Sequence, residues 1–363
     1  MNPFPSSPRF IGRAAQQSPP NRFEKLHCEA DDEHLSWEEA NTAADPQRVP
    51  TEFLPDEAKT ILRENNSPDI PFRWSLNPYR GCEHGCAYCY ARPGHETLGM
   101  NAGLDFETKI LVKHDAPRLL RAELNRPGWA AEVIVMSGVT DCYQPAERRF
   151  RLTRACLEVL WEARQPVGFV TKNALILRDL DLLKPLAENH LVNISVSLTT
   201  LDEELARTLE PRTATPSARL RTIKELATAG VPVRVMAAPM IPGLNDRELP
   251  AILEAAKEAG ARDAGYTLLR LPLSVEPVFT AWLRQNRPDE AERIIARIRH
   301  TRGGRMNDSQ FGSRFRGEGA YAEQIAQNFR VFRTKFGLTG PLPPLDSSQF
   351  RPPRLEGAQL RMF

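Results

Sequence analysis

Residues 72–90 read FRWSLNPYRGCEHGCAYCY, a short strand pattern followed at once by a cysteine-rich loop. The strand is predicted over Phe72–Tyr79. Three cysteines of the loop follow a C-x3-C-x2-C spacing: Cys82, Cys86 and Cys89. Gly81 and Gly85 allow tight backbone bends, so three thiolates on this loop can converge on one face of a cubane cluster.

The fourth corner of such a cluster decides its chemistry. A 4Fe–4S electron carrier takes four cysteines, whereas three leave one iron open to an exogenous ligand, as a catalytic cluster requires. We favour the open cluster, but three alternatives remain. His84 can complete a structural Cys3His zinc site, although it is crowded between two cysteines. Cys142 or Cys156 can complete an electron-transfer cluster. Finally, the three can be unrelated core cysteines, which their clustering argues against.

Composition narrows the class of protein further. The chain of 363 residues has 48 Lys+Arg against 46 Asp+Glu, and a net charge of +2 does not indicate a strong polyanion binder. No apolar run is long enough for a signal peptide or a membrane helix, so we expect a cytoplasmic protein with reduced thiols and no membrane partner. Six cysteines in that setting favour metal ligation, with Cys28 as an incidental thiol.

Outward from the loop, strand patterns alternate with amphipathic helical segments, the signature of βαβ units and a parallel sheet. Six strands are predicted: Phe72–Tyr79, Val133–Ser137, Val167–Thr171, Leu191–Leu198, Val231–Ala238 and Ala264–Leu269. Five helical segments with apolar stripes lie between them. This α/β pattern is too short for an eight-stranded barrel. It fits a partial (β/α)6 barrel or an open doubly wound sheet, and in both the C-terminal strand ends carry the chemistry.

Three regions are predicted from these patterns. Residues 1–50 are rich in Pro, Ser, Gln and charge, and we expect a disordered or extended tail, or one laid over the core. Residues 51–275 form the core, with the cluster loop at 82–89. Residues 276–363 form a C-terminal helical, Arg-rich extension that ends in a Pro-rich extended tail.

The extension contains a basic stretch. Between Arg293 and Arg316 there are seven arginines and one acid, Asp308, with Phe311 and Phe315 among them. Arginine guanidinium groups form paired hydrogen bonds to phosphates, and aromatic rings stack on unpaired bases. The stretch can therefore bind a nucleic-acid substrate. The alternative is a solvated charged face, which is commoner.

The cysteine loop resembles that of the radical S-adenosylmethionine (SAM) superfamily. The signature of this superfamily is C-x3-C-x-Φ-C with Φ aromatic, and Tyr88 occupies the Φ position here. More narrowly, the sequence resembles the spore-photoproduct-lyase-like branch over about residues 55–275. The matching segments are SPDIPFRWSLNPYRGCEHGCAYCYARP, TDCYQPAERRFRLTR, FVTKN, LEPRTATPSARL and APMIPGLND. The resemblance implies a partial (β/α)6 TIM-like barrel of the radical SAM type.

The resemblance also implies cofactors and chemistry. The three cysteines would bind three irons of a 4Fe–4S cluster, and SAM would chelate the fourth through its amino and carboxylate groups. One electron from a flavodoxin- or ferredoxin-type reductant would cleave SAM to a 5′-deoxyadenosyl radical that abstracts a hydrogen from the substrate. We therefore expect an enzyme of lyase or oxidoreductase type whose cofactors supply the radical chemistry.

The fourth predicted strand offers residues for SAM. Its alternation places Asn193, Ser195 and Ser197 on one face, which should be the barrel lumen. The lyases carry a SAM-contacting serine on this strand, and Ser195 matches it best. The alternative is that these serines only supply hydrogen bonds at the strand edges. Tyr88 can stack on adenine or simply pack the loop.

Polar residues at other strand ends are further candidates. Lys172 matches a lysine that contacts the SAM carboxylate in the lyases, and a solvated loop lysine is the alternative. After the second strand, Asp141 with Thr140 can replace the usual turn that holds the SAM amino group. Glu210 and Arg219 are also candidates, with a surface ion pair as the alternative for Arg219.

The lyases use a protein cysteine as hydrogen donor, and its place in this sequence is Val139. Cys142 lies three residues further on and can act as a hydrogen donor, or it can be a small buried hydrophobe. The offset argues against thymine-dimer repair. Cys156 shares a helical stripe with Leu152 and Val159, so we expect it in the core.

Overall fold

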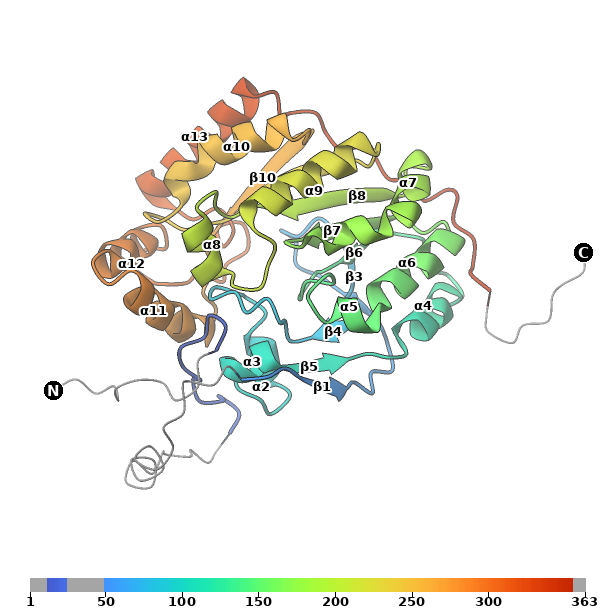
Figure 1. Cartoon of the computed structure of the whole chain (residues 1–363), viewed down its shortest axis with the longest axis horizontal. Helices are drawn as coiled ribbons and strands as arrows, with labels where there is room; N and C mark the ends of the chain where they lie inside the picture. Colours follow the sequence, from blue (N-terminus) through green and yellow to red (C-terminus); the bar gives the residue numbers. More distant parts are fainter. Residues whose placement is uncertain (1–11, 25–48, 355–363) are drawn as a thin grey trace, which may run out of the picture.

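The computed structural model describes residues 12–24 and 49–354, in which a curved, mostly parallel sheet is flanked by helices (Figure 1). The strand order of the sheet is β10-β9-β8-β7-β6-β3-β2. Its strands are β2 (Leu62–Glu64), β3 (Trp74–Leu76), β6 (Ile134–Met136), β7 (Val167–Thr171), β8 (Val192–Ser197), β9 (Val233–Met240) and β10 (Asp263–Leu268). The six predicted strands are confirmed. They run parallel, and β2 adds an antiparallel edge to β3.

The sheet stays open, because its two ends in the described part of the chain are β10 and β2, which do not pair with each other. The mixed α/β fold with a parallel sheet agrees with the predicted partial barrel. Five helices follow the strands as expected: α4 (Ala116–Leu124), α6 (Leu152–Glu162), α7 (Leu180–Glu188), α9 (Pro216–Thr228) and α10 (Leu249–Glu258). Ile194 and Val196 of β8 share one apolar core with Ile223 and Leu226 of α9. The alternate serines of β8 therefore point to the other face of the sheet.

A second, smaller sheet was not predicted from the sequence. Its strands are β1 (Glu52–Pro55), β5 (Lys109–Val112) and β4 (Tyr79–Arg80), and Figure 1 shows it below the main sheet. Short elements accompany it and the strand ends: α2 (Pro93–Glu96), α3 (Leu104–Thr108), α5 (Glu147–Phe150), η1 (Ala174–Asp179), α8 (Glu203–Leu209) and η2 (Asp246–Glu248). The strands of the small sheet are two to four residues long, and β1 pairs with β5 across more than fifty positions, so no local pattern predicted the sheet. The small sheet matters because the cysteine loop leaves directly from β4.

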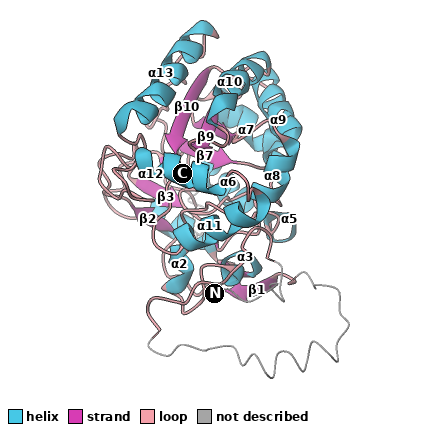
Figure 2. Cartoon of the chain, turned by 90° about the vertical axis from the view of Figure 1, so that its left-hand side faces the viewer, coloured by secondary structure: helices cyan, strands magenta, loops and turns pink. Residues whose placement is uncertain are grey.

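The C-terminal extension is helical, as expected. Its helices are α11 (Val275–Asn286), α12 (Ala291–His300) and α13 (Gly319–Lys335). Phe279 and Trp282 of α11 pack in one apolar cluster with Cys86 and Tyr88 of the cysteine loop. Helix α13 lies beside α10 and β10 (Figure 2). The extension is thus part of the wall around the loop.

The extended segment after α13 covers the opposite end of the sheet. Asn193 Nδ2 donates to the Pro343 carbonyl at 2.9 Å, and Arg351 N donates to the Ala163 carbonyl at 2.9 Å. These contacts lie at the N-terminal ends of β7 and β8. The C-terminal strand ends, where chemistry is expected, face the cysteine loop instead.

Part of the predicted N-terminal tail is described, and it lies against the core. Ala14 and Ala15 are fully buried and Asn21 is nearly so. Residues 1–11 and 25–48, with the predicted incidental thiol Cys28, lie outside the described residues. Among the helices that the structure describes, none has the length and apolar character of a membrane span.

Candidate metal centre

The cysteine loop is a compact series of turns between β4 and α2. The Gly85 amide donates to the Cys82 carbonyl at 3.1 Å, and the Cys89 amide to the Cys86 carbonyl at 3.2 Å. Gly81 and Gly85 have positive φ angles of 80° and 64°. A Cβ added at Gly81 would lie 2.8 Å from His95 Cε1. The bends predicted for these two glycines are therefore real, and no larger residue fits at Gly81 without displacing its neighbour.

A buried arginine holds the loop through its backbone. The Arg92 side chain is inaccessible to solvent, and its Nη2 donates to the Gly85 carbonyl at 3.2 Å and the Cys86 carbonyl at 2.8 Å. It also forms an ion pair of 2.5 Å with the fully buried Glu107. Gln144 supports the start of the loop, since it accepts from the Glu83 amide and donates to the Gly81 carbonyl. Neither Arg92 nor Gln144 was singled out from the sequence.

The three thiols fit a cluster by their chemistry. All three are free, Cys82 and Cys86 are buried, and Cys89 is partly buried. The pKa of Cys82 lies well above its usual value, mainly because the thiol is buried and also because the Cys89 thiol is close to it. Burial likewise raises the pKa of Cys86 and Cys89. Thiolates at these positions need a positive charge beside them, and a bound iron cluster supplies it.

His84 does not behave as a fourth ligand. Its Nδ1 lies 3.5 Å from Asp141 Oδ2, and its Nε2 lies 3.1 Å from Asn173 Nδ2. Burial lowers the pKa of His84 to about 4, so the ring is neutral. Both ring nitrogens face protein partners, which does not favour the Cys3His zinc interpretation. In the described residues, no three Cys, His, Asp or Glu side chains converge as ligands of one metal ion.

The remaining described cysteines lie elsewhere. Cys142 and Cys156 are fully buried in the main apolar core, whereas Cys86 belongs to a separate cluster beside α11. This placement does not favour either of them as a fourth cluster ligand. The burial of Cys142 favours its interpretation as a small buried hydrophobe, and its role as a hydrogen donor stays a prediction. Val139, in contrast, is 45% exposed.

Three of the predicted SAM residues meet beside the loop. The Lys172 ammonium donates to Ser197 Oγ at 2.9 Å and lies 5.9 Å from the Tyr88 ring centre. Ser195 is one step deeper on the same face of β8, and its Oγ accepts from Arg234 Nε at 2.8 Å. The alternation predicted for β8 thus gives two buried serines with different partners. Their contacts with SAM stay predictions.

Asp141 connects two strand ends. Its carboxylate accepts from the Lys172 amide at 2.8 Å, the Thr171 hydroxyl at 2.9 Å and the Tyr143 amide at 2.9 Å. Its neighbour Thr140 donates through Oγ1 to the Tyr79 carbonyl at 3.0 Å. Protein groups therefore already use the carboxylate that was expected to hold the SAM ammonium, and that role also stays a prediction.

A buried ion pair locks Tyr88 in place. Arg219 Nη2 lies 2.6 Å from Glu210 Oε2, and both side chains are almost inaccessible. The Tyr88 hydroxyl donates to the same carboxylate, as does the Thr199 hydroxyl at 2.8 Å. The alternative of a surface ion pair for Arg219 is wrong, because the segment around Glu210 packs on the loop, where the Ala87 amide donates to the Leu209 carbonyl. Contacts of Glu210 and Arg219 with SAM stay predictions.

Three exposed side chains, Tyr90, Val139 and Phe311, and three partly buried ones border the loop; we call these six residues the mouth patch. Its members are Tyr90, Val139, Arg270, Phe311, Arg314 and Phe315. Tyr90 is 50% exposed and donates to the Gly138 carbonyl at 2.7 Å. Arg270 and Arg314 each lie 4.9 Å from the Phe315 ring centre, and Arg314 lies 4.7 Å from that of Phe311.

The basic stretch is only partly available for a ligand. Arg293 pairs with Glu290, Arg297 donates to the Tyr321 hydroxyl, and Arg314 pairs with Asp69. The nearly inaccessible Arg302 donates to the Leu269 and Ser313 carbonyls. These arginines stabilise the fold of the extension, so the stretch as a whole is not a free cationic surface.

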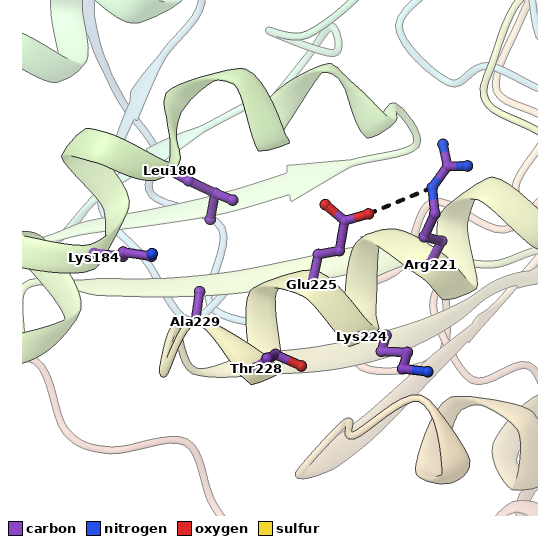
Figure 3. Close-up of a pocket in the computed structure, with 7 residues that line it drawn as sticks. All are labelled: Leu180, Lys184, Arg221, Lys224, Glu225, Thr228 and Ala229. Carbon is purple, nitrogen blue, oxygen red and sulfur yellow. Dashed lines mark ion pairs between the residues drawn. The ribbon is translucent and has the colours of Figure 1, made fainter.

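A groove of about 490 Å³ opens between α7 and α9 (Figure 3). It is lined by Leu180, Lys184, Arg221, Lys224, Glu225, Thr228 and Ala229. These residues belong to or adjoin the two helices that cover the outer face of the sheet. The groove is separate from the strand ends that hold the cysteine loop.

Comparisons with known proteins agree with this geometry. Residues 76–256 match the family profile of the Radical SAM superfamily. An uncharacterised protein of Mycobacterium tuberculosis (strain ATCC 25618 / H37Rv) is 36% identical over 286 residues, which are 77% of this chain and 80% of that protein. An uncharacterised protein of Methanocaldococcus jannaschii is 28% identical over 243 residues, covering 67% of this chain and 86% of that protein.

Solved structures share the fold. Spore photoproduct lyase complexed with dinucleoside spore photoproduct has a TM-score of 0.58 and 16% identity, and the match covers 78% of this chain and 79% of the lyase. A mutant of that lyase with bound AdoMet and dinucleoside spore photoproduct has a TM-score of 0.57 and 16% identity, covering 84% and 91%. At this identity the likeness is one of fold.

Proposed function

This chain belongs to the radical SAM superfamily, and we propose that it binds a 4Fe–4S cluster through Cys82, Cys86 and Cys89 and reductively cleaves SAM for hydrogen abstraction from a substrate. Members of the superfamily use this cluster and SAM, which supply the one-electron radical chemistry. One observation carries the proposal. Three free thiols lie on one anchored loop, while both nitrogens of His84, the nearest alternative ligand, are turned to Asp141 and Asn173.

The chain's own residues would bind and orient the cofactors. The Lys172 ammonium beside Ser197 provides a positive charge for the carboxylate of SAM. Glu210 fixes the Tyr88 ring beside the cluster loop. The apolar side chains of Phe279 and Trp282 exclude water from the loop, which protects a reactive species from side reactions.

Anaerobic purification with iron analysis tests the proposal. The expected result is a brown protein with about four irons per chain that forms 5′-deoxyadenosine from SAM after reduction with dithionite. Cys86→Ala should lose the colour and the SAM cleavage. The matched control is Cys156→Ala, which removes a buried thiol from the core and should keep both. A colourless zinc protein, or equal iron loss in both variants, would contradict the proposal.

The proposed physiological reductant is a flavodoxin- or ferredoxin-type protein, since reductive cleavage needs a single low-potential electron. Reduced flavodoxin should replace dithionite in the SAM-cleavage assay. If no flavodoxin or ferredoxin supports turnover while dithionite does, this part of the proposal fails.

A nucleic acid is the proposed substrate class. The mouth patch supports it, because the exposed aromatic rings of Tyr90 and Phe311 suit stacking with unstacked bases. Phe311→Ala should weaken binding of a fluorescent single-stranded oligonucleotide about fivefold or more, since stacking contributes about 1–3 kcal/mol per base. Val331→Ala removes another exposed apolar side chain, on α13, and should have no effect. Equal affinity of all three proteins would count against this substrate class.

A further inference from the structure

The described N-terminal residues 12–24 cross the cysteine loop; we call them the strap. Ala14 and Ala15 are fully buried although the strap has no regular secondary structure. Ala14 packs in the same apolar cluster as Cys86 and Ala87 of the loop. A segment that lacks helix or strand is buried here because it fills a side of the cysteine loop that the barrel leaves uncovered.

Glu107 joins the strap to the loop. Its carboxylate, at the end of α3, accepts from the Arg13 amide at 2.5 Å and from the Ala15 amide at 2.9 Å. The same carboxylate pairs with Arg92, whose guanidinium holds two carbonyls of the loop. Loss of the strap would therefore expose Glu107 and disturb the charge balance around Arg92.

The contact between the strap and its surroundings leaves no spare room. A Cβ added at Gly85 of the loop would lie 2.6 Å from Arg13 Cβ, and one added at Gly103 would lie 2.3 Å from the Gln17 carbonyl oxygen. Further along, Asn21 Nδ2 donates to the Glu96 carbonyl at 3.0 Å. The strap is thus fixed at both ends, over the loop and over α2.

We propose that residues 12–24 form a wall of the cluster site, which closes the Cys86 side of the loop against solvent and so retains the cluster. This inference rests on the proposed function, because it requires that the loop holds iron. It assigns a binding-site role to a segment far outside the matched family region, which begins at residue 76.

A pair of strap variants of the full-length protein tests the inference. Ala14→Glu places a carboxylate in the apolar contact with Cys86 and close to Glu107, so the strap should detach. Pro20→Glu adds the same charge at an exposed strap position and should leave the strap in place. Limited trypsin digestion with mass spectrometry reports detachment as faster cleavage after Arg22, a strap residue that neither substitution adjoins and that pairs with Glu96 in the attached strap. The remaining intact fragment shows that the core is folded.

The second readout is the loss of iron from the anaerobically prepared protein to a ferrous chelator. Ala14→Glu should lose its cluster about tenfold faster than Pro20→Glu and the wild type, because local opening governs access. Faster cleavage after Arg22 without faster iron loss would overturn the inference, and so would an Ala14→Glu strap that stays protected. A wild-type protein that never holds iron would instead refute the proposed function.

Discussion

Replacement of Arg219 by methionine is expected to lower the free energy of unfolding by about 3–5 kcal/mol, because it leaves the Glu210 carboxylate buried without its positive partner. The two side chains are 1% and 0% exposed and 2.6 Å apart. The same helix offers a matched control, since Arg221 lies 3.6 Å from Glu225 with 65% and 47% of these side chains exposed. Arg221→Met should cost about 0–1 kcal/mol.

Urea unfolding of the cluster-free proteins, followed by circular dichroism, measures both losses. A domain of this kind is stable by about 5–15 kcal/mol, so the loss in Arg219→Met should move the midpoint clearly. Adding Glu210→Gln to Arg219→Met should restore about 1–3 kcal/mol, since no unpaired charge then remains buried. If Arg219→Met and Arg221→Met lie within 1 kcal/mol of each other, the inferred stabilisation by the buried pair is refuted.

Burial lowers the pKa of Lys113 from 10.5 to about 8, so the folded protein releases this proton before the unfolded chain does. Stability should therefore rise by roughly 3 kcal/mol between pH 8 and 10.5 relative to Lys113→Met; urea titrations at several pH values measure this, with the exposed Lys59→Met as control. Arg92→Met leaves Glu107 unpaired and should both destabilise the protein by about 3–5 kcal/mol and lower its iron content, and a wild-type iron content would count against the role of Arg92 in holding the loop. Cys142→Ser should keep iron and SAM cleavage, because the side chain is enclosed by the core; loss of cleavage with iron retained would support the hydrogen-donor hypothesis instead.

Most of the fold was predicted from local sequence patterns. The six parallel strands and the five following helices were predicted because period-two and period-3.6 patterns repeat within a few residues. The edge strand β2 and the small sheet of β1, β5 and β4 were missed, because no sustained alternation of apolar and polar residues marks these segments. Strand β1 also depends on β5, a partner far along the chain. The contact of residues 12–24 with the core was only an alternative to disorder, because their composition is that of a disordered tail, and no pattern indicated that Ala14 and Ala15 would be buried.

By itself, the sequence determined the cysteine loop, the positions of its bends and the strand face that carries Ser195 and Ser197, because spacing and alternation act over neighbouring residues. Only the tertiary structure decided what surrounds them. The Glu210 carboxylate meets Tyr88 across 122 positions, and the Glu107 carboxylate meets the Ala15 amide across 92. No local sequence pattern encodes such contacts between residues far apart in the chain. These contacts form because a buried polar group is stable only with a hydrogen-bond partner. The tertiary packing decides which partner lies within hydrogen-bond distance.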